Sequence, residues 1–216
     1  MILRPALVIF DCDGVLIDSE GPASALCATA VTELGWHMTA EQALHTFMGM
    51  RISDMPAMIE RQSGRPVPPG WVEAMRDRLI SVLDTQSALI PGAREAIEAV
   101  AAAGVPYRIA SNSSHEEMAV KFARTGLTSL VVGRVHSARD VGVGKPAPDV
   151  FLAAAQAEGI DPARCLVVED SLPGVRAAMA AGMPVLGLDL YGDGAALAAL
   201  GAIPIRTLTA LHDYLV

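Results

Sequence analysis

Five runs of apolar residues have the length and composition of buried strands, at residues 6–10, 105–110, 130–135, 165–169 and 184–189. The runs "ALVIF" and "CLVVE" are almost continuous in apolar residues, a pattern typical of strands buried on both faces of a parallel sheet. Alanine-rich stretches with helical spacing lie between or beside the later runs, at residues 92–103, 114–125, 147–158 and 173–181. This alternation predicts a doubly wound, Rossmann-like parallel α/β sheet.

The interval between residues 19 and 88 has a different pattern. Helical spacing occurs near residues 22–34, 40–47, 53–62 and 71–84, with breakers at Gly35, Gly49 and the segment "GRPVPPG". We therefore expect two domains, an α/β core of residues 1–18 and 89–216 and an inserted all-helical unit of residues 19–88. An insertion after the first strand is well placed to cap the carboxyl ends of the strands, where open α/β sheets bind ligands.

Composition narrows the class of protein. With 216 residues and 52% hydrophobic residues the chain is globular, and its net charge of −8 argues against binding to nucleic acid or anionic membranes. We find no apolar stretch long enough to span a bilayer, and "MILRPALVIF" is too short for a signal peptide. Three scattered cysteines fit reduced thiols, so we expect a cytoplasmic protein.

Polar side chains gather at the predicted strand ends. They are Asp11 and Asp13 after the first strand, Ser111 and Asn112 after the second, Glu169 and Asp170 after the fourth, and Lys145 ahead of a sheet helix. These points converge on one crevice of a doubly wound sheet. So many carboxylates repel one another unless a cation is present, and oxygen-only ligands favour Mg²⁺. Lys145 and Ser111 would then hold a phosphate group.

Four motifs follow one another along the chain, "DCDGVLIDSE", "SNSS", "GKPAPDVF" and "VVEDSLPGV". In these motifs and their order the chain resembles the haloacid dehalogenase superfamily of phosphohydrolases, and the likeness covers essentially the whole chain. The helical insertion resembles the cap of β-phosphoglucomutase-like members. This resemblance implies that Asp11 is a nucleophile that forms an aspartyl-phosphate, and that Asp13 is the acid and base.

The resemblance also implies the ligands of the metal and of the phosphate. Mg²⁺ would bind Asp11, the backbone carbonyl of Asp13, and Asp170, with Glu169 acting directly or through water. Phosphate would contact Ser111, Asn112 and Lys145. For Arg51, in the cap loop "GMRISDM", a solvated side chain and a substrate contact both stay open.

Ser114 and the two lysines of the chain lie in or near these motifs. Ser114 is expected to be a helix N-cap, and Lys121, in mid-helix, is expected to be exposed. The chain has two lysines against fourteen arginines, so we interpret a lysine at a motif position, Lys145, as functional.

The expected partner is a small phosphate ester, such as a sugar or polyol phosphate, and the expected state is a monomer. A phosphomutase of the β-phosphoglucomutase type and a non-catalytic phosphate sensor are the alternatives. The mutase pattern implies a cap histidine, lysine and arginine, which fall here at Ala23, Met48 and Ile52, all apolar. The sequence therefore favours net hydrolysis.

Overall fold

The computed structural model describes residues 4–47 and 50–215 and divides into two compact units. The first comprises residues 1–18 and 88–216, and the second comprises residues 19–87. A two-stranded antiparallel ribbon, formed by β2 (Ile17–Asp18) and β3 (Ala88–Leu89), stands where the chain leaves the first unit and returns to it.

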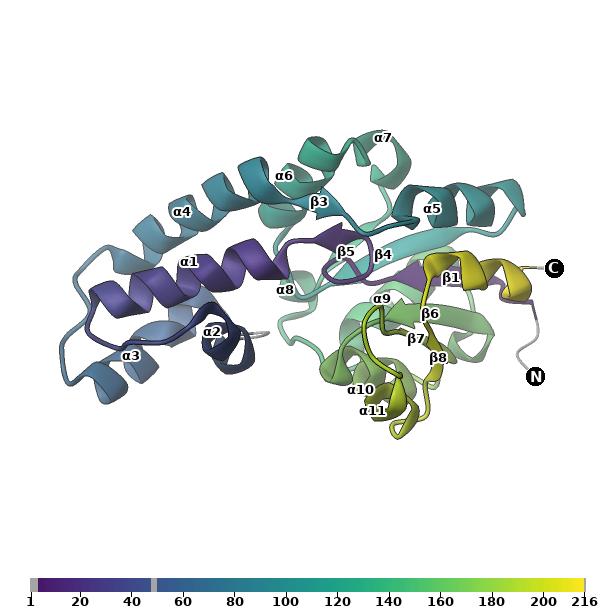
Figure 1. Ribbon diagram of the computed structural model, residues 1–216. Coiled ribbons are helices and arrows are strands. Elements are labelled where there is room, and N and C mark those ends of the chain that lie inside the picture. Colours follow the sequence, from purple (N-terminus) through teal and green to yellow (C-terminus); the bar gives the residue numbers. More distant parts are fainter. Residues whose placement is uncertain (1–3, 48–49, 216) are drawn as a thin grey trace. The chain divides into compact units, whose positions relative to one another are not determined.

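A six-stranded parallel sheet forms the centre of the first unit, with strand order β5-β4-β1-β6-β7-β8 (Figure 1). The strands are β1 (Leu7–Phe10), β4 (Tyr107–Ser111), β5 (Val135–Ser137), β6 (Cys165–Glu169), β7 (Val185–Leu188) and β8 (Ile203–Ile205). The predicted doubly wound α/β fold is confirmed.

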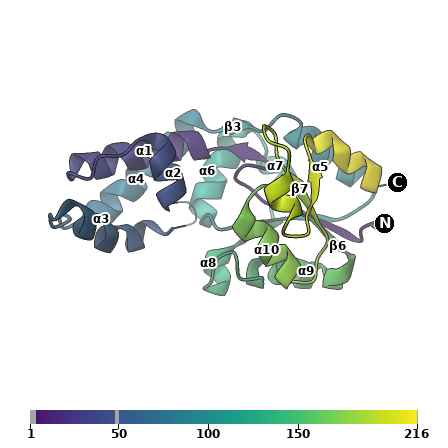
Figure 2. The same cartoon turned by 60° about the horizontal axis from the view of Figure 1, so that its bottom comes forward.

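Helices cover both faces of this sheet (Figures 1 and 2). Along one face lie α5 (Ala93–Ala102), α6 (His115–Thr125), α7 (Thr128–Val131) and the C-terminal 3₁₀ helix (Leu208–Tyr214). Along the other lie α8 (Ala138–Val141), α9 (Asp149–Glu158), α10 (Leu172–Ala180) and α11 (Ala195–Ala198), while a short 3₁₀ turn, Pro162–Arg164, precedes β6.

Strand β1 shows why the apolar runs are continuous. Val8 and Phe10 pack into the core on one face of the sheet, and Leu7 and Ile9 pack into the core on the other. All four side chains are fully buried. A central strand covered on both faces has no solvent side, so polar residues are absent until the strand ends.

One predicted strand was wrong. The run 130–135 does not form a strand, because Leu130 and Val131 belong to α7 and β5 begins only at Val135. Between them Gly133 has a φ of +74°, a left-handed conformation that glycine adopts without strain. A short apolar run does not by itself distinguish a strand from a buried helical turn.

The secondary-structure elements described in the second unit are all α-helices or 3₁₀ turns. They are α1 (Glu20–Glu33), α2 (Ala40–Phe47), a 3₁₀ turn (Ile52–Asp54), α3 (Met55–Ser63) and α4 (Trp71–Gln86). Apolar side chains from these elements, among them Val31, Phe47, Ile59 and Met75, make a separate hydrophobic core. Met48, one of the positions compared with mutases, and Gly49, one of the predicted helix breakers, lie outside the described residues. No described helix in either unit is both long enough and apolar enough to cross a bilayer.

Candidate active site

Three adjacent strands deliver the candidate residues to one edge of the sheet. Asp11 follows β1 directly, Ser111 is the last residue of β4, and Glu169 is the last residue of β6. Since β4, β1 and β6 are parallel neighbours, their carboxyl ends lie side by side. This is the edge at which open α/β sheets bind ligands.

The two aspartates lie where β1 runs into a tight turn. The amide of Asp11 still donates to the Val168 carbonyl at 2.9 Å, as a continuation of the sheet. Immediately beyond, the amides of Leu16 and Ile17 both donate to the carbonyl of Cys12, at 3.0 and 2.9 Å. The chain thus reverses at once, which places Asp11 and Asp13 on a backbone fixed by hydrogen bonds.

Lys145 neutralises the first aspartate. Its Nζ donates to Asp11 Oδ1 at 2.5 Å, to Glu169 Oε1 at 2.7 Å and to the Ala110 carbonyl at 3.0 Å. The ammonium group therefore uses all three of its protons within the protein. The Lys145 side chain is only 4% exposed, so this ion pair is shielded from water.

Burial dominates the electrostatics of these groups. Desolvation raises the pKa of Asp11 to about 7, although the neighbouring Lys145 ammonium lowers it. For Lys145, burial alone would lower the pKa, but the Asp11 and Glu169 carboxylates together raise it above its ordinary value. The lysine is therefore charged at neutral pH, and it favours the ionised form of Asp11 that a nucleophile requires.

Glu169 is clamped by groups of the protein itself. Its Oε2 accepts from the amides of Asp170 and Ser171, both at 2.9 Å, and from Ser171 Oγ at 3.0 Å. The start of α10 lies against the carboxylate so closely that a Cβ at Gly174 would overlap it. Because both oxygens already accept hydrogen bonds, Glu169 is suited to orient its neighbours.

The acids at this edge fit a divalent cation. Carboxylate oxygens of Asp11, Glu169 and Asp170 lie within 4.8 Å of one another. Asp170 rests against Gly14, whose φ is +80° and where a Cβ would overlap its carboxylate. A set of oxygen donors, with room left beside them by the missing side chain of Gly14, suits Mg²⁺. This ion keeps several of its ligand positions for water and substrate. With Glu169 committed to its own hydrogen bonds, Asp11 and Asp170 are the carboxylates best placed as ligands.

Lys121 was predicted to be exposed, and this was wrong. It is 1% exposed, and its Nζ donates to both carboxylate oxygens of Asp13, at 2.7 and 2.8 Å. The signal was present in the spacing, because Met118, Lys121 and Phe122 share the buried face of α6. Sequence reasoning also passed over Ser113, whose Oγ donates to Asp13 Oδ2 at 2.8 Å.

The remaining candidate residues fall into two groups. Ser111 Oγ accepts from the Ser113 amide at 3.1 Å, and Asn112 Oδ1 accepts from the Lys145 amide at 2.9 Å, so both belong to the same network. Arg51 lies in the second unit, where it pairs with Asp54 at 2.9 Å and has a 64% exposed side chain. The expected N-cap is confirmed, since Ser114 Oγ accepts from the Glu117 amide in a capping box.

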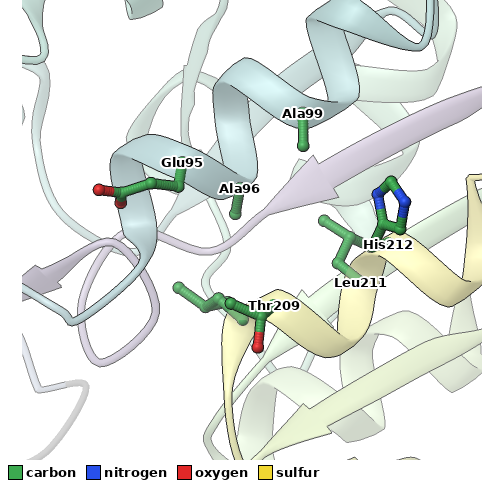
Figure 3. A pocket seen from close by; sticks show the side chains of 7 residues that line it. Glu95, Ala96, Ala99, Thr209, Leu211 and His212 are labelled. Carbon is green, nitrogen blue, oxygen red and sulfur yellow. The ribbon is translucent and has the colours of Figure 1, made fainter.

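Two other features lie apart from this chemistry. The three cysteines are free, and burial raises the pKa of each thiol, so they are protonated at neutral pH. A mainly apolar groove lies between α5 and the C-terminal 3₁₀ helix (Figure 3). Its lining residues are Glu95, Ala96, Ala99, Leu208, Thr209, Leu211 and His212, and no candidate residue is among them.

Comparison with known proteins agrees with this geometry. The family model of haloacid dehalogenase-like hydrolases matches residues 5–182, so the chain belongs to this family of enzymes. It is 32% identical to hexitol phosphatase B of Escherichia coli (strain K12), over 81% of this chain and 79% of the relative. It is 33% identical to a β-phosphoglucomutase of Mycobacterium bovis, over 74% of this chain and 63% of the relative.

Solved structures give the same family. A haloacid dehalogenase family hydrolase from Deinococcus radiodurans R1, with bound phosphate and sodium, matches with a TM-score of 0.79 and 34% identity. The match covers 96% of this chain and 93% of the other.

Proposed function

We propose that this hydrolase is an Mg²⁺-dependent phosphatase that releases phosphate from a small sugar or polyol phosphate through an aspartyl-phosphate on Asp11. The observation that most supports this proposal is the ion pair between buried Asp11 and Lys145, which lies beside Asp13 and Asp170 at the carboxyl edge of the sheet. The names of the relatives, which include a hexitol phosphatase, agree with this substrate class.

In the first half of the proposed reaction, a carboxylate oxygen of Asp11 attacks phosphorus and the bond from phosphorus to the ester oxygen breaks. Asp13, protonated at this stage, gives its proton to the departing oxygen, so that a neutral alcohol leaves. The covalent intermediate divides one difficult displacement into two easier ones.

In the second half, Asp13 takes a proton from a water molecule whose oxygen attacks the same phosphorus. The bond between Asp11 and phosphorus breaks, and inorganic phosphate and both carboxyl groups are regenerated. Ester and water thus give alcohol and phosphate, with Asp13 carrying one proton in each half.

The Mg²⁺ ion would be held by Asp11, Asp170 and the backbone carbonyl of Asp13, and Glu169 would orient its neighbours at this site. When bound, the ion supplies positive charge that reduces repulsion between the Asp11 carboxylate and the phosphate and stabilises charge in the transition state. Ser111, Asn112 and Lys145 would bind phosphate oxygens, and Lys145 would exchange one of its present hydrogen bonds for this contact.

The second unit would act as a cap over the site, with Arg51 as a candidate substrate contact. The active species would be a cytoplasmic monomer whose partner is the small phosphate ester. The cap role rests on the family resemblance and on the compactness of the helical unit, and the cytoplasmic location rests on the three scattered cysteines.

A phosphomutase is the second candidate, because a β-phosphoglucomutase is among the relatives. A mutase passes the phosphoryl group to a sugar hydroxyl and keeps water away. The positions that resemblance gives to its cap histidine and arginine hold Ala23 and Ile52, and Ile52 is only 9% exposed within the second unit's own core. This favours hydrolysis over mutase chemistry, while the presence of Asp13 as acid and base favours an enzyme over a sensor with no turnover.

The test is a panel of phosphorylated metabolites assayed for released phosphate with Mg²⁺, using wild type, Asp11→Asn and the matched surface variant Asp213→Asn. We expect activity in wild type and Asp213→Asn, and a loss of at least about 10³-fold in kcat for Asp11→Asn, because the nucleophile is removed. Near-wild-type turnover by Asp11→Asn would refute the assignment of Asp11 as the nucleophile. Complete inactivity of metal-loaded wild type on every ester would favour the sensor.

A further inference from the structure

Lys121 is a buried cation that the proposed reaction does not use. It lies in mid-α6 on the same buried face as Met118 and Phe122, and its side chain is 2% exposed. Its Nζ donates to both oxygens of Asp13 and, at 2.9 Å, to Ser113 Oγ. An ammonium group has three protons, so every donor of Lys121 is used inside the chain and none is left for substrate.

Stability alone does not account for this lysine. Removing an ammonium group from water carries a large desolvation penalty, and replacing a buried ion pair by apolar side chains is often neutral or stabilising. Both lysines of this chain are buried at this edge, and each pairs with a different aspartate: Lys145 with Asp11, and Lys121 with Asp13. This one-to-one pairing points to a role in the chemistry of Asp13.

We propose that Lys121 is a positioning residue that, together with Ser113, holds the Asp13 carboxyl group in the orientation from which it transfers its proton. The inference rests on the proposed function, in which Asp13 is the acid and base.

The contacts around Asp13 carry this inference. Lys121 bonds both oxygens, and Ser113 Oγ adds a second donor to Oδ2, so rotation of the carboxyl group about its axis would break hydrogen bonds at both oxygens. Ser113 is fixed in turn, because its carbonyl accepts from Ser137 Oγ at 2.7 Å. Proton transfer needs its partners within hydrogen-bond reach and in line, so a carboxyl group with one allowed orientation has an advantage over a freely rotating one.

The proposal predicts a defect that depends on the leaving group. An alkyl phosphate must receive a proton on its departing oxygen, whereas 4-nitrophenyl phosphate releases a stable nitrophenolate without one. We expect Lys121→Met to slow phosphoryl transfer from an alkyl ester in a single turnover by about 100-fold, the lower range for a general acid. The nitrophenolate burst should change by less than about tenfold, followed by slow steady-state release, because Asp13 must still activate water.

Three further variants complete the experiment. Arg124→Met, an exposed cation-to-methionine change one turn further along α6, should behave as wild type with both esters. Ser113→Ala should show the same leaving-group pattern as Lys121→Met, but weaker. If Lys121→Met fails to fold, as judged by circular dichroism, Lys121→Gln, which is uncharged but keeps an N–H donor group, replaces it in every comparison.

Equal slowing of both esters, or no slowing of either, would overturn the positioning role while leaving the phosphatase assignment intact. A wild-type protein that releases no phosphate from any ester would instead refute the proposed function itself. A Mg²⁺ requirement for half-maximal rate that rises in Lys121→Met as it does in Asp170→Ala would also overturn the positioning role, because the lysine would then be acting through the metal site.

Discussion

The hydrogen bonds that hold Glu169 against the start of α10 make Gly174→Ala an unusual substitution. In an unhindered helix a change from glycine to alanine stabilises by about 0.5–1 kcal/mol, because the unfolded chain loses conformational freedom. At Gly174 the new methyl group would overlap the Glu169 carboxylate, which must therefore move. Moving it breaks the bond to Lys145 at 2.7 Å and the bonds to two amides at 2.9 Å.

The expected magnitude follows from these contacts. Breaking one partnership of a buried ion pair costs about 3–5 kcal/mol, and the helical gain offsets at most about 1 kcal/mol. We therefore expect Gly174→Ala to lower the free energy of unfolding by about 2–4 kcal/mol. Because Glu169 orients Lys145 and the backbone of Asp170, we also expect kcat to fall by at least about tenfold.

The assay is urea unfolding followed by circular dichroism, with phosphate release measured on the same samples. Gly21→Ala is the matched control, because Gly21 lies in α1 with open space around its would-be Cβ, and this variant should be as stable as wild type or slightly more so. A Gly174→Ala protein with wild-type stability and activity would refute the idea that Glu169 is held against α10.

The other predictions concern the metal, the product and the pH dependence. Chelation should abolish phosphate release and Mg²⁺ restore it, and Asp170→Ala should raise the Mg²⁺ concentration for half-maximal rate by about 100-fold, more than Glu169→Ala does; full activity in excess EDTA would contradict the metal site. With β-glucose 1-phosphate or glucose 6-phosphate supplied, phosphorus NMR should show free phosphate and little interconversion, and efficient isomerisation would favour the mutase. Burial, aided by Arg108, lowers the pKa of His136 from 6.5, so the unfolded chain binds this proton at a higher pH than the folded one does. The contribution of His136 to the free energy of unfolding is therefore fully present above pH 6.5 and is lost as the pH drops through the lower pKa of the folded state. His136→Gln should flatten this dependence of stability on pH, and an unchanged slope would show that another group is responsible.

The sequence predicted the fold where burial left little choice. The run 165–169 forms β6 over the same residues, because a central parallel strand must be apolar throughout. The edge strand β8, Ile203–Ile205, gave no such signal, since it contains Pro204 and two of its three residues are exposed. The wrongly predicted strand at 130–135 shows the opposite failure, in which apolar residues suggest a strand but pack as a helical turn.

The candidate site was predictable in part, because motif residues at strand ends converge in any doubly wound sheet. Lys121 was missed because a mid-helix lysine is normally solvated, and only its position on the apolar face of α6 indicates burial. What each site residue does stays a prediction, as does the role of Arg51, since charge and spacing do not show where a ligand lies.

The central claim is that Asp11 carries the phosphoryl group, and borohydride trapping tests it most directly. Wild type and Asp13→Asn would be mixed with substrate and Mg²⁺, quenched, reduced with borohydride and mapped by peptide mass spectrometry, with Asp11→Asn as control. Reduction converts an aspartyl-phosphate to homoserine, so the account predicts homoserine at position 11, most strongly in Asp13→Asn, where hydrolysis of the intermediate is slowed, and none in the control. Phosphate release with an unmodified Asp11, or with the mark on another residue, would contradict it.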